Sequence, residues 1–274
     1  MSDWRPLDQE LDRWAAAGRK ATLWWRDDDA GAPTAALERL LDLAARSGQP
    51  LALAVIPDRA EAALAERLSK QAPDIAVLQH GFAHRNHAPD GEKKCELTAP
   101  RQRPETPEEL GRGREILKAL FGARALPVLV PPWNRIDPEM TAALPALGFT
   151  GLSTYKARKQ PQPRPGLQQV NCHLDILQWR PERRFLGFAE AVALLTDHLR
   201  ARREGNADPA EPSGILSHHA VHDEAAWAFL EDLLERLARH PAVRFLPAVE
   251  AFAPDRRLET GQPAQAGRRA GGGA

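Results

Sequence analysis

Three consecutive carboxylates, Asp27, Asp28 and Asp29, end the short apolar run that begins at Leu23. Adjacent like charges repel one another, so such a cluster is most often the solvated turn or helix start that follows a strand. A bound cation would also stabilise the cluster, because its charge offsets the repulsion between the carboxylates. The choice between these interpretations depends on whether other segments of the chain supply metal ligands.

Histidines follow a second apolar run, 75–79. His80 and His84 are four residues apart, and Gly81 beside His80 favours a loop or a single helical turn. Two imidazoles and one carboxylate suit Zn²⁺ or another divalent ion and leave coordination positions open for water. We therefore predict a metal site made of two histidines and one aspartate.

Three more polar groups follow apolar runs of strand length or lie within them. Because the carboxyl ends of parallel strands meet at one rim of a barrel, we expect all these side chains to converge there. Trp133 is expected to line a pocket, since aromatic faces suit sugar rings. The three groups are Pro132-Trp133-Asn134, Asp175 with Trp179, and His218-His219.

Strand and helix patterns alternate about seven times along the chain. The run 51–56 is apolar on both faces, as in parallel strands covered by helices. Apolar residues spaced three and four apart, between the cap Thr34 and the stop Gly48, indicate an amphipathic helix. This alternation predicts an α/β fold, an irregular (β/α)7-type barrel. The rival doubly wound sheet has less support, since no glycine-rich phosphate turn follows the first strand.

The remaining segments are assigned from the same patterns. Segment 88–106 is long and charged, and loops of that length tend to be functional or disordered. His198 falls on a predicted helix and is expected at the surface. From 256 onward the chain has little apolar content, so 256–274 is predicted to be disordered. Predicted strands cover 23–29, 51–56, 75–79, 126–130, 149–153, 170–176, 215–217 and 243–246, and predicted helices 8–17, 35–47, 60–68, 108–121, 138–147, 186–203 and 224–238.

Composition excludes several classes of partner. The 274 residues contain 37 Lys and Arg against 37 Asp and Glu, so the formal charge is zero and neither nucleic acid nor an anionic membrane is an expected partner. Acidic residues within the first twenty positions argue against a secretory signal. Cys95 and Cys172 lack metal-type spacing, which favours a reducing, cytoplasmic location. Composition indicates no particular oligomeric state.

The order of these groups resembles the polysaccharide deacetylases of the NodB-homology type, a metal-dependent family with an incomplete (β/α) barrel. The family pattern consists of an Asp pair after a strand, H-x-x-x-H, a proline-containing strand end, an Asp followed shortly by Trp, and L-x-H. Each motif is short, but all five occur in family order between Leu23 and His219. The matching residues are Asp28-Asp29, His80 with His84, Pro131-Pro132-Trp133, Asp175 with Trp179, and Leu216-Ser217-His218.

The resemblance implies a role for each matched residue. Asp28 would be the general base, and His218 the general acid, oriented by Asp175. The metal ligands would be Asp29, His80 and His84. Pro132, Trp133, Asn134 and Trp179 would contact substrate, and Arg26, Asp27, His87 and His219 would support the site or contact substrate.

Two questions stay open in the sequence. The Asp pair could instead be Asp27-Asp28. Strand alternation places Asp28 on the same side as Arg26, which would favour the ionised carboxylate. The family also has an Arg just before its prolines, where this chain has Val130, so that either Arg26 or Arg135 substitutes or the chemistry has changed.

The predicted function is that of a hydrolase. Residues 1–255 would form a single catalytic domain that removes an acetyl group from an N-acetylated sugar or a related small amide. Zn²⁺ is the favoured metal, with Co²⁺, Ni²⁺, Mn²⁺ and Fe²⁺ as alternatives. Two other hypotheses are an Fe(II) enzyme of oxygen chemistry that uses the same two-His-one-Asp site, and a carbohydrate-binding barrel without catalysis.

Overall fold

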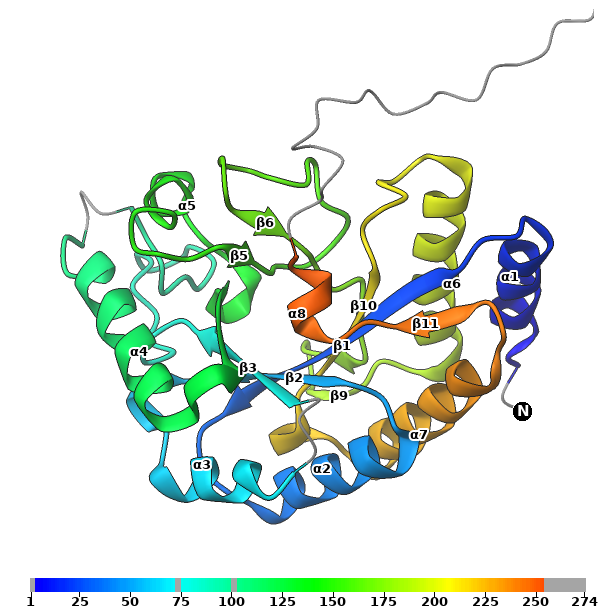
Figure 1. The fold of residues 1–274 in the computed structure, drawn as a ribbon, viewed down its shortest axis with the longest axis horizontal. Helices are drawn as coiled ribbons and strands as arrows, with labels where there is room; N and C mark the ends of the chain where they lie inside the picture. The colour runs from blue at the N-terminus through cyan, green and yellow to red at the C-terminus, as the bar shows by residue number, and fades with distance from the viewer. Residues whose placement is uncertain (1–2, 72–74, 100–102, 254–274) are drawn as a thin grey trace, which may run out of the picture.

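Strand β1 (Ala21–Ala30), which carries the three carboxylates, lies inside the main sheet. The computed structural model describes residues 3–71, 75–99 and 103–253. Within them the strand order is β6-β5-β4-β3-β2-β1-β10-β7, with β11 paired to the start of β1. All pairings in this sheet are parallel. The sheet curls into an open barrel (Figure 1). Its strand order ends at β6 on one side and at β7 on the other. The predicted α/β barrel is confirmed.

Parallel pairing aligns the strands so that the groups after them reach one rim. Asp27 of β1 is level with Ser217 of β10 and with Leu53 of β2, and His80 of β3 with Val130 of β4. The remaining strands are β2 (Leu51–Val55), β3 (Ile75–His80), β4 (Ala125–Val130), β5 (Gly151–Leu152), β6 (Gln168–Gln169), β7 (Leu174–Asp175), β10 (Ser213–Ser217), β11 (Val243–Phe245) and a separate antiparallel pair, β8 (Leu177–Gln178) with β9 (Arg184–Phe185).

The longer helices of the described residues lie around the outside of the curled sheet (Figure 1). They are amphipathic, and the apolar faces of α2 and α7 join the strands in one core that includes Leu40, Leu53 and Leu233. No helix in the described part of the chain is long and apolar enough to cross a membrane. The surrounding helices are α1 (Arg5–Ala16), α2 (Ala35–Ser47), α3 (Ala62–Ser69), α4 (Thr106–Phe121), α6 (Phe188–Glu204) and α7 (Glu224–Arg239); α5 (Pro138–Ala143), α8 (Ala248–Ala251) and the 3₁₀ turns η1 (Pro57–Arg59), η2 (Gly122–Arg124), η3 (Pro132–Asn134) and η4 (His219–Val221) complete the fold.

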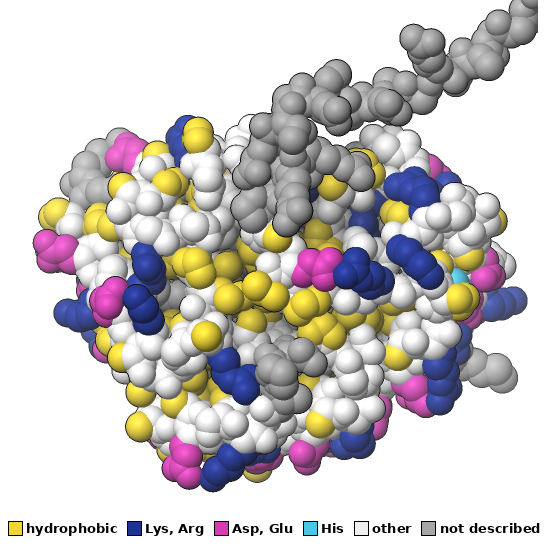
Figure 2. Space-filling model, viewed as in Figure 1, with side chains coloured by type: hydrophobic (Ala, Val, Ile, Leu, Met, Phe, Trp, Pro, Cys, Tyr) yellow, Lys and Arg dark blue, Asp and Glu magenta, His cyan; other side chains and the backbone are white. Residues whose placement is uncertain are grey.

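A second apolar cluster fills the inside of the barrel. Trp24 packs edge-on against Phe252, just after α8, at a centroid distance of 5.4 Å. The indole nitrogen of Trp24 donates to the carbonyl of Asn171, so its polar atom is paired although the side chain is fully buried. Figure 2 shows hydrophobic side chains gathered across the middle of the face on which α8 lies, with charged side chains mostly around its edge.

Several predicted helices and strands are shorter in the structure than expected, and several short elements of the structure were not predicted. The predicted helix 138–147 ends at Ala143, close before Pro145, whose ring opposes continuation of a helix. The predicted strands 149–153 and 170–176 reduce to two residues each. The β8-β9 pair and α8 were not predicted, since elements of two to four residues carry no periodic signal. The predicted tail, 256–274, lies outside the described residues.

Candidate active site

Each of the three consecutive carboxylates has a different partner, and that of Asp28 is Arg26. The Arg26 guanidinium donates from Nε to Asp28 Oδ1 at 2.8 Å and from Nη2 to Oδ2 at 3.0 Å. Both side chains are buried. Two parallel charge-assisted hydrogen bonds fix the orientation of the carboxylate as well as its charge. As strand alternation predicts, Arg26 and Asp28 lie on the same side of β1.

Arg26 is itself held by two neighbouring segments. Its Nη1 donates to Ser153 Oγ at 2.6 Å, just after β5, and its Nη2 donates to Asn134 Oδ1 at 2.7 Å. Arg135 is exposed instead and donates to the carbonyl of Lys94. Arg26 is therefore the arginine that contacts Asp28, where the family resemblance leads us to expect one at position 130. The side chain of Asn134, expected on substrate, contacts Arg26.

Asp27 points toward β10 and η4. Its Oδ2 accepts from Ser217 Oγ at 2.6 Å and from the His219 backbone N–H at 3.0 Å, and its Oδ1 contacts His219 Nδ1. Burial opposes the ionisation of both groups, but their mutual attraction outweighs it, so the pKa of Asp27 is lowered and that of His219 is raised. Asp27 and His219 thus form a buried ion pair between β1 and the segment after β10.

Asp29 departs from the alternation of the strand. Its φ of 74° lies in the left-handed region, which non-glycine residues seldom adopt. Its Oδ1 lies 3.2 Å from His80 Nε2 and 3.4 Å from His84 Nε2. The structure therefore brings together the three residues predicted as metal ligands, with Asp29 as the carboxylate.

The atoms of this group fit a divalent cation. His80 Nδ1 lies 3.0 Å from the carbonyl oxygen of Val130, which can only accept, so Nδ1 carries the proton and Nε2 of the neutral ring is an acceptor. Nε2 then faces another acceptor, Asp29 Oδ1, which is buried and has no hydrogen-bond donor among the described residues. Two ligands placed tetrahedrally about 2.1 Å from a zinc ion lie about 3.4 Å apart, close to the separations here.

The electrostatics favour the ligand form of two of the three side chains, Asp29 and His84, whereas the pKa of His80 is raised, because the nearby carboxylates Asp28 and Asp29 outweigh the effect of its burial. Burial opposes ionisation of Asp29, but the proximity of the three imidazoles, that of His80 above all, outweighs it and leaves the pKa of Asp29 below its ordinary value. Burial, followed by the neighbouring His80, lowers the pKa of His84 and so favours its neutral ring. An ionised carboxylate and a neutral imidazole are the forms that bind metals.

His218 lies between two carboxylates. Its Nε2 is 3.9 Å from Asp28 Oδ2, and its Nδ1 is 4.0 Å from Asp175 Oδ1. Asp175 is fixed by Trp179, whose indole N–H donates to Oδ2 at 2.7 Å, and by the backbone N–H of Leu177. Burial raises the pKa of Asp175. The predicted acid and base therefore lie next to each other, with Asp175 on the far side of the imidazole.

Two tryptophans flank these residues. Trp179 is 43% exposed, and its ring lies edge-on to His218 at 4.6 Å between centroids. Trp133, partly buried, lies 4.5 Å from the ring of His84. Of the other predicted substrate contacts, Pro132 is buried beneath the histidine loop, where a Cβ added at Gly81 would lie 2.6 Å from its Cγ.

His87 does not join this group. Its ring contacts the guanidinium of Arg103, and its backbone N–H donates to the carbonyl of Cys95. Both contacts lie within the long segment that follows the histidine loop. The structure thus gives His87 a place in that segment and no contact with Asp29 or His84 among the described interactions.

Sequence analysis did not identify some of the residues that position the site. Ser153 contacts Arg26, Ser217 contacts Asp27, and Glu96 contacts the backbone between the two histidines. Single serines and a glutamate in a charged loop have no distinguishing spacing. Only Ser217, inside the L-x-H motif, stands next to a residue that the sequence had singled out.

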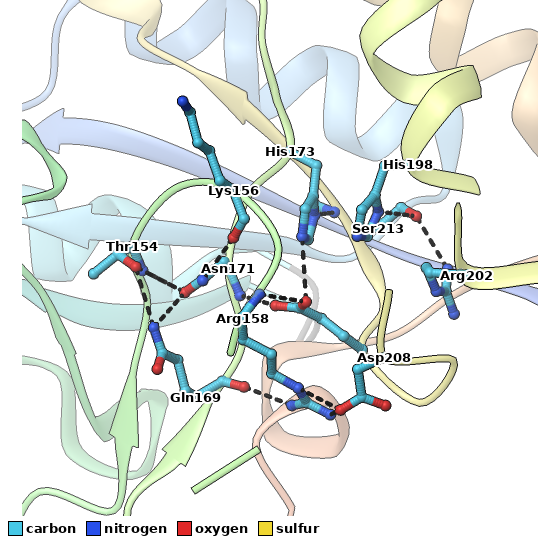
Figure 3. Close-up of polar contacts among 12 residues, drawn as sticks. Thr154, Lys156, Arg158, Gln169, Asn171, His173, His198, Arg202, Asp208 and Ser213 are labelled. Atoms are coloured by element: carbon cyan, nitrogen blue, oxygen red, sulfur yellow. Dashed lines mark hydrogen bonds and ion pairs between the residues drawn. The ribbon is translucent and has the colours of Figure 1, made fainter. Parts of the chain in front are cut away.

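A second histidine–carboxylate group lies at the amino end of β10 (Figure 3). His173, His198 and Glu211 are all buried, so the predicted surface position of His198 is wrong. His173 Nδ1 accepts from the Gly214 N–H, which leaves the proton of the neutral ring on Nε2, the nitrogen that faces Glu211. The rings of His173 and His198 stack face to face at 3.3 Å, so their in-plane lone pairs cannot both point at one ion. This group suits a polar core contact better than a metal.

Among known proteins, solved structures provide the similarities to this chain. No protein-family model matches the sequence, and no curated protein matches it. A protein from Mycobacterium smegmatis assigned as a polysaccharide deacetylase is 15% identical and covers 92% of this chain and 95% of its own, with a TM-score of 0.63.

Two further structures are similar at the same level. One is the T48 deacetylase with substrate, at 18% identity over 86% of this chain and 92% of its own, with a TM-score of 0.52. The other is a family 4 acetyl xylan esterase from Clostridium thermocellum in complex with a cobalt ion, at 16% identity over 84% and 90%, with a TM-score of 0.50. At such identities the similarity is one of fold.

Proposed function

Because the chain has the fold of the polysaccharide deacetylases, we propose that it is a metal-dependent deacetylase acting on an N-acetylated sugar or a related small amide. One observation carries the proposal. Asp29, His80 and His84 converge on one point, and the oriented carboxylate Asp28 and the imidazole of His218 lie beside them. This arrangement supplies metal ligands, a base and an acid in one place.

Each residue has a part in amide hydrolysis. A divalent cation held by Asp29, His80 and His84 would polarise the acyl carbonyl and lower the pKa of a water ligand. Asp28, kept oriented and charge-paired by Arg26, accepts the proton of the attacking water. His218 donates a proton to the departing nitrogen, and Asp175 stabilises the imidazolium from which that proton leaves.

The surroundings favour a sugar as the group that carries the acetyl. Trp179 lies beside His218 and Trp133 lies beside His84, and sugar rings stack on aromatic faces of this kind. Among the similar structures, one is a deacetylase with substrate and one an acetyl xylan esterase. An N-acetyl sugar is our proposal, and an O-acetyl sugar is the outcome that would correct it.

Zinc is the metal that we propose. Two imidazoles and one carboxylate suit zinc and leave open positions, and a similar structure contains a cobalt ion. The metal content of protein purified without added ions should be close to one zinc per chain, and a chelator should abolish acetate release until zinc is restored. Iron together with oxygen-dependent turnover would indicate the alternative Fe(II) chemistry.

Acetate release from a panel of sugars tests the activity. The panel includes N-acetylglucosamine, its short oligomers and an O-acetylated xylose oligomer, each assayed with wild-type protein and with Asp28→Asn. We expect release from an N-acetylated member that falls by about 10²–10⁴ in the variant while zinc stays bound. Sugar binding that a chelator does not alter, without release from any member, would favour the non-catalytic alternative.

The extent of the domain and the location of the protein are also proposed. We infer that residues 1–255 form one catalytic domain, supported by a single main sheet whose strands come from both halves of the described chain. We infer a cytoplasmic location, supported by two free cysteines, Cys95 and Cys172. Limited proteolysis and fractionation of cells test these two inferences.

A further inference from the structure

Glu96 lies beneath the loop that separates the two proposed metal-binding histidines. Its side chain is only 2% exposed, although it comes from a segment whose charged neighbours Glu92, Lys93 and Lys94 are exposed. A buried carboxylate loses its hydration and therefore needs hydrogen-bond donors around it. The donors that surround Glu96 identify what it does.

Backbone N–H groups of the histidine loop provide these donors. Glu96 Oε2 accepts from Phe82 N at 3.1 Å, and Oε1 accepts from Ala83 N at 2.8 Å and from Arg85 N at 3.3 Å. Successive backbone N–H groups that converge in this way form a cradle for an anion. The loop thus takes its shape around the carboxylate, and both carboxylate oxygens are used in doing so.

Gly81 allows the carboxylate to come this close. Gly81 has a φ of 56°, and a Cβ added there would lie 1.9 Å from Glu96 Oε2 and 2.6 Å from Pro132 Cγ. Its own N–H donates to the carbonyl of Val130 at 3.0 Å. The loop is therefore enclosed between Glu96 and Pro132, and only glycine fits at its first position.

The two histidines depend on this loop to different extents. His80 belongs to β3, so the sheet holds it, and its Nδ1 contacts the carbonyl of Val130. His84 lies outside any strand or helix, with a φ of 56°, a conformation that costs energy in a non-glycine residue. The surrounding contacts must hold His84 there, and the N–H groups on either side of it, Ala83 and Arg85, both donate to Glu96.

We propose that Glu96 is a positioning residue of the metal centre, which holds the 81–85 loop so that His84 Nε2 meets Asp29 and His80. The inference rests on the proposed function, because it takes these three residues as metal ligands. Glu96 is not itself a ligand, since its oxygens are occupied by backbone N–H groups. Its role is to lower the cost of bringing His84 into place before the ion binds.

Zinc affinity measures this role directly. In Glu96→Gln the amide NH₂ faces backbone donors in place of an acceptor, so the loop loses part of its support. Residues that orient metal ligands typically change metal affinity by about 10–100-fold. We expect the zinc dissociation constant of the chelator-stripped protein, from competition with a chromogenic chelator, to rise by about that factor. The matched control is Glu92→Gln, which removes an exposed carboxylate from the same segment and should leave the constant unchanged.

A double-mutant cycle separates positioning from general stability. If Glu96 acts through His84, then Glu96→Gln should raise the dissociation constant much less in a His84→Ala background than in wild type. Equal and independent effects in the two backgrounds would contradict the proposal. Equal loss of thermal stability in apo and zinc-loaded Glu96→Gln, with an unchanged dissociation constant, would show a purely structural role and would also overturn it.

The zinc measurements distinguish a failure of the role proposed for Glu96 from a failure of the proposed metal-dependent function. Wild-type protein and Glu92→Gln that both bind no zinc would overturn the metal centre and the inference with it. Tight zinc binding by wild type and by Glu96→Gln alike would overturn the inference alone. Glu96→Asp, which keeps the charge but shortens the reach, serves if Glu96→Gln does not fold, and it should show an intermediate dissociation constant.

Discussion

Arg26 and Asp28 form a buried bidentate pair, with N···O distances of 2.8 and 3.0 Å, at the point where β1 reaches the rim of the barrel. The pair is local in sequence, since two residues on the same side of one strand contact each other. It is also connected to the rest of the rim, because Ser153 and Asn134 accept from the same guanidinium. Its geometry leads to the first prediction.

Arg26→Lys should impair catalysis more than metal binding. Lysine keeps the positive charge but cannot donate two parallel hydrogen bonds to Asp28 or reach Ser153 and Asn134 at the same time. We expect kcat for acetate release to fall by about 10-fold or more, with zinc stoichiometry unchanged. A variant with unaltered kcat would show that the orientation of Asp28 does not limit the reaction.

The three aspartates should respond differently to the same substitution. Asp29→Asn should lose zinc, whereas Asp28→Asn should keep zinc and lose activity by about 10²–10⁴. Asp27→Asn should keep zinc and show lower thermal stability, because it leaves His219 without its buried partner. Measurements of zinc content, kcat and melting temperature on the three variants test these separate roles. Loss of zinc in Asp27→Asn with retention in Asp29→Asn would reverse the assignment.

Trp179 should contribute to binding through its ring and to catalysis through its N–H. Trp179→Ala removes an exposed aromatic face and should raise KM for the sugar substrate. Trp179→Phe keeps a ring but removes the hydrogen bond to Asp175 Oδ2, so it should lower kcat with a smaller change in KM. Steady-state kinetics of the two variants test this division. Identical kinetic changes in both would contradict it.

The buried histidine stack should make the protein sensitive to acid. Burial, with the neighbouring His173, lowers the pKa of His198 to about 2 from the ordinary 6.5, so below pH 6.5 the unfolded chain binds a proton that the folded protein does not. Stability therefore falls as the pH falls through this range. One such group removes about 2 kcal/mol from the free energy of unfolding between pH 7 and pH 5.

His198→Gln provides the test of this acid sensitivity. Glutamine can keep a hydrogen bond to Ser213 but does not titrate. Glu211, whose pKa is raised by burial, changes stability in the opposite direction, but it is present in both proteins. Denaturant unfolding at pH 7 and pH 5, with chelator present, should show a smaller loss of stability in the variant. An equal loss in both would mean that His198 is not held neutral.

The sequence predicted the parts of the fold that depend on local periodicity. Helix α2 lies between its cap Thr34 and Gly48, as predicted, because the Thr34 side chain accepts from Leu37 N and Gly48 adopts the left-handed conformation. Strand β2 is buried on both faces, as its continuous apolar run indicates. Helix α5 ended early and β5 shrank to two residues, since a short pattern interrupted by proline does not determine where hydrogen bonding stops.

The sequence by itself also determined which residue types arrive at the rim, because a strand delivers the residues that follow it to its carboxyl end. Only the tertiary structure decided how they pair. The positive φ of Asp29 turns it to His80 and His84, Asp27 meets His219 from 192 positions away, and Glu96 shapes a loop from beneath. The physical reason is that strand alternation is a property of neighbouring residues, whereas a strained φ, a buried ion pair and a carboxylate cradle are stabilised only by segments that packing brings together.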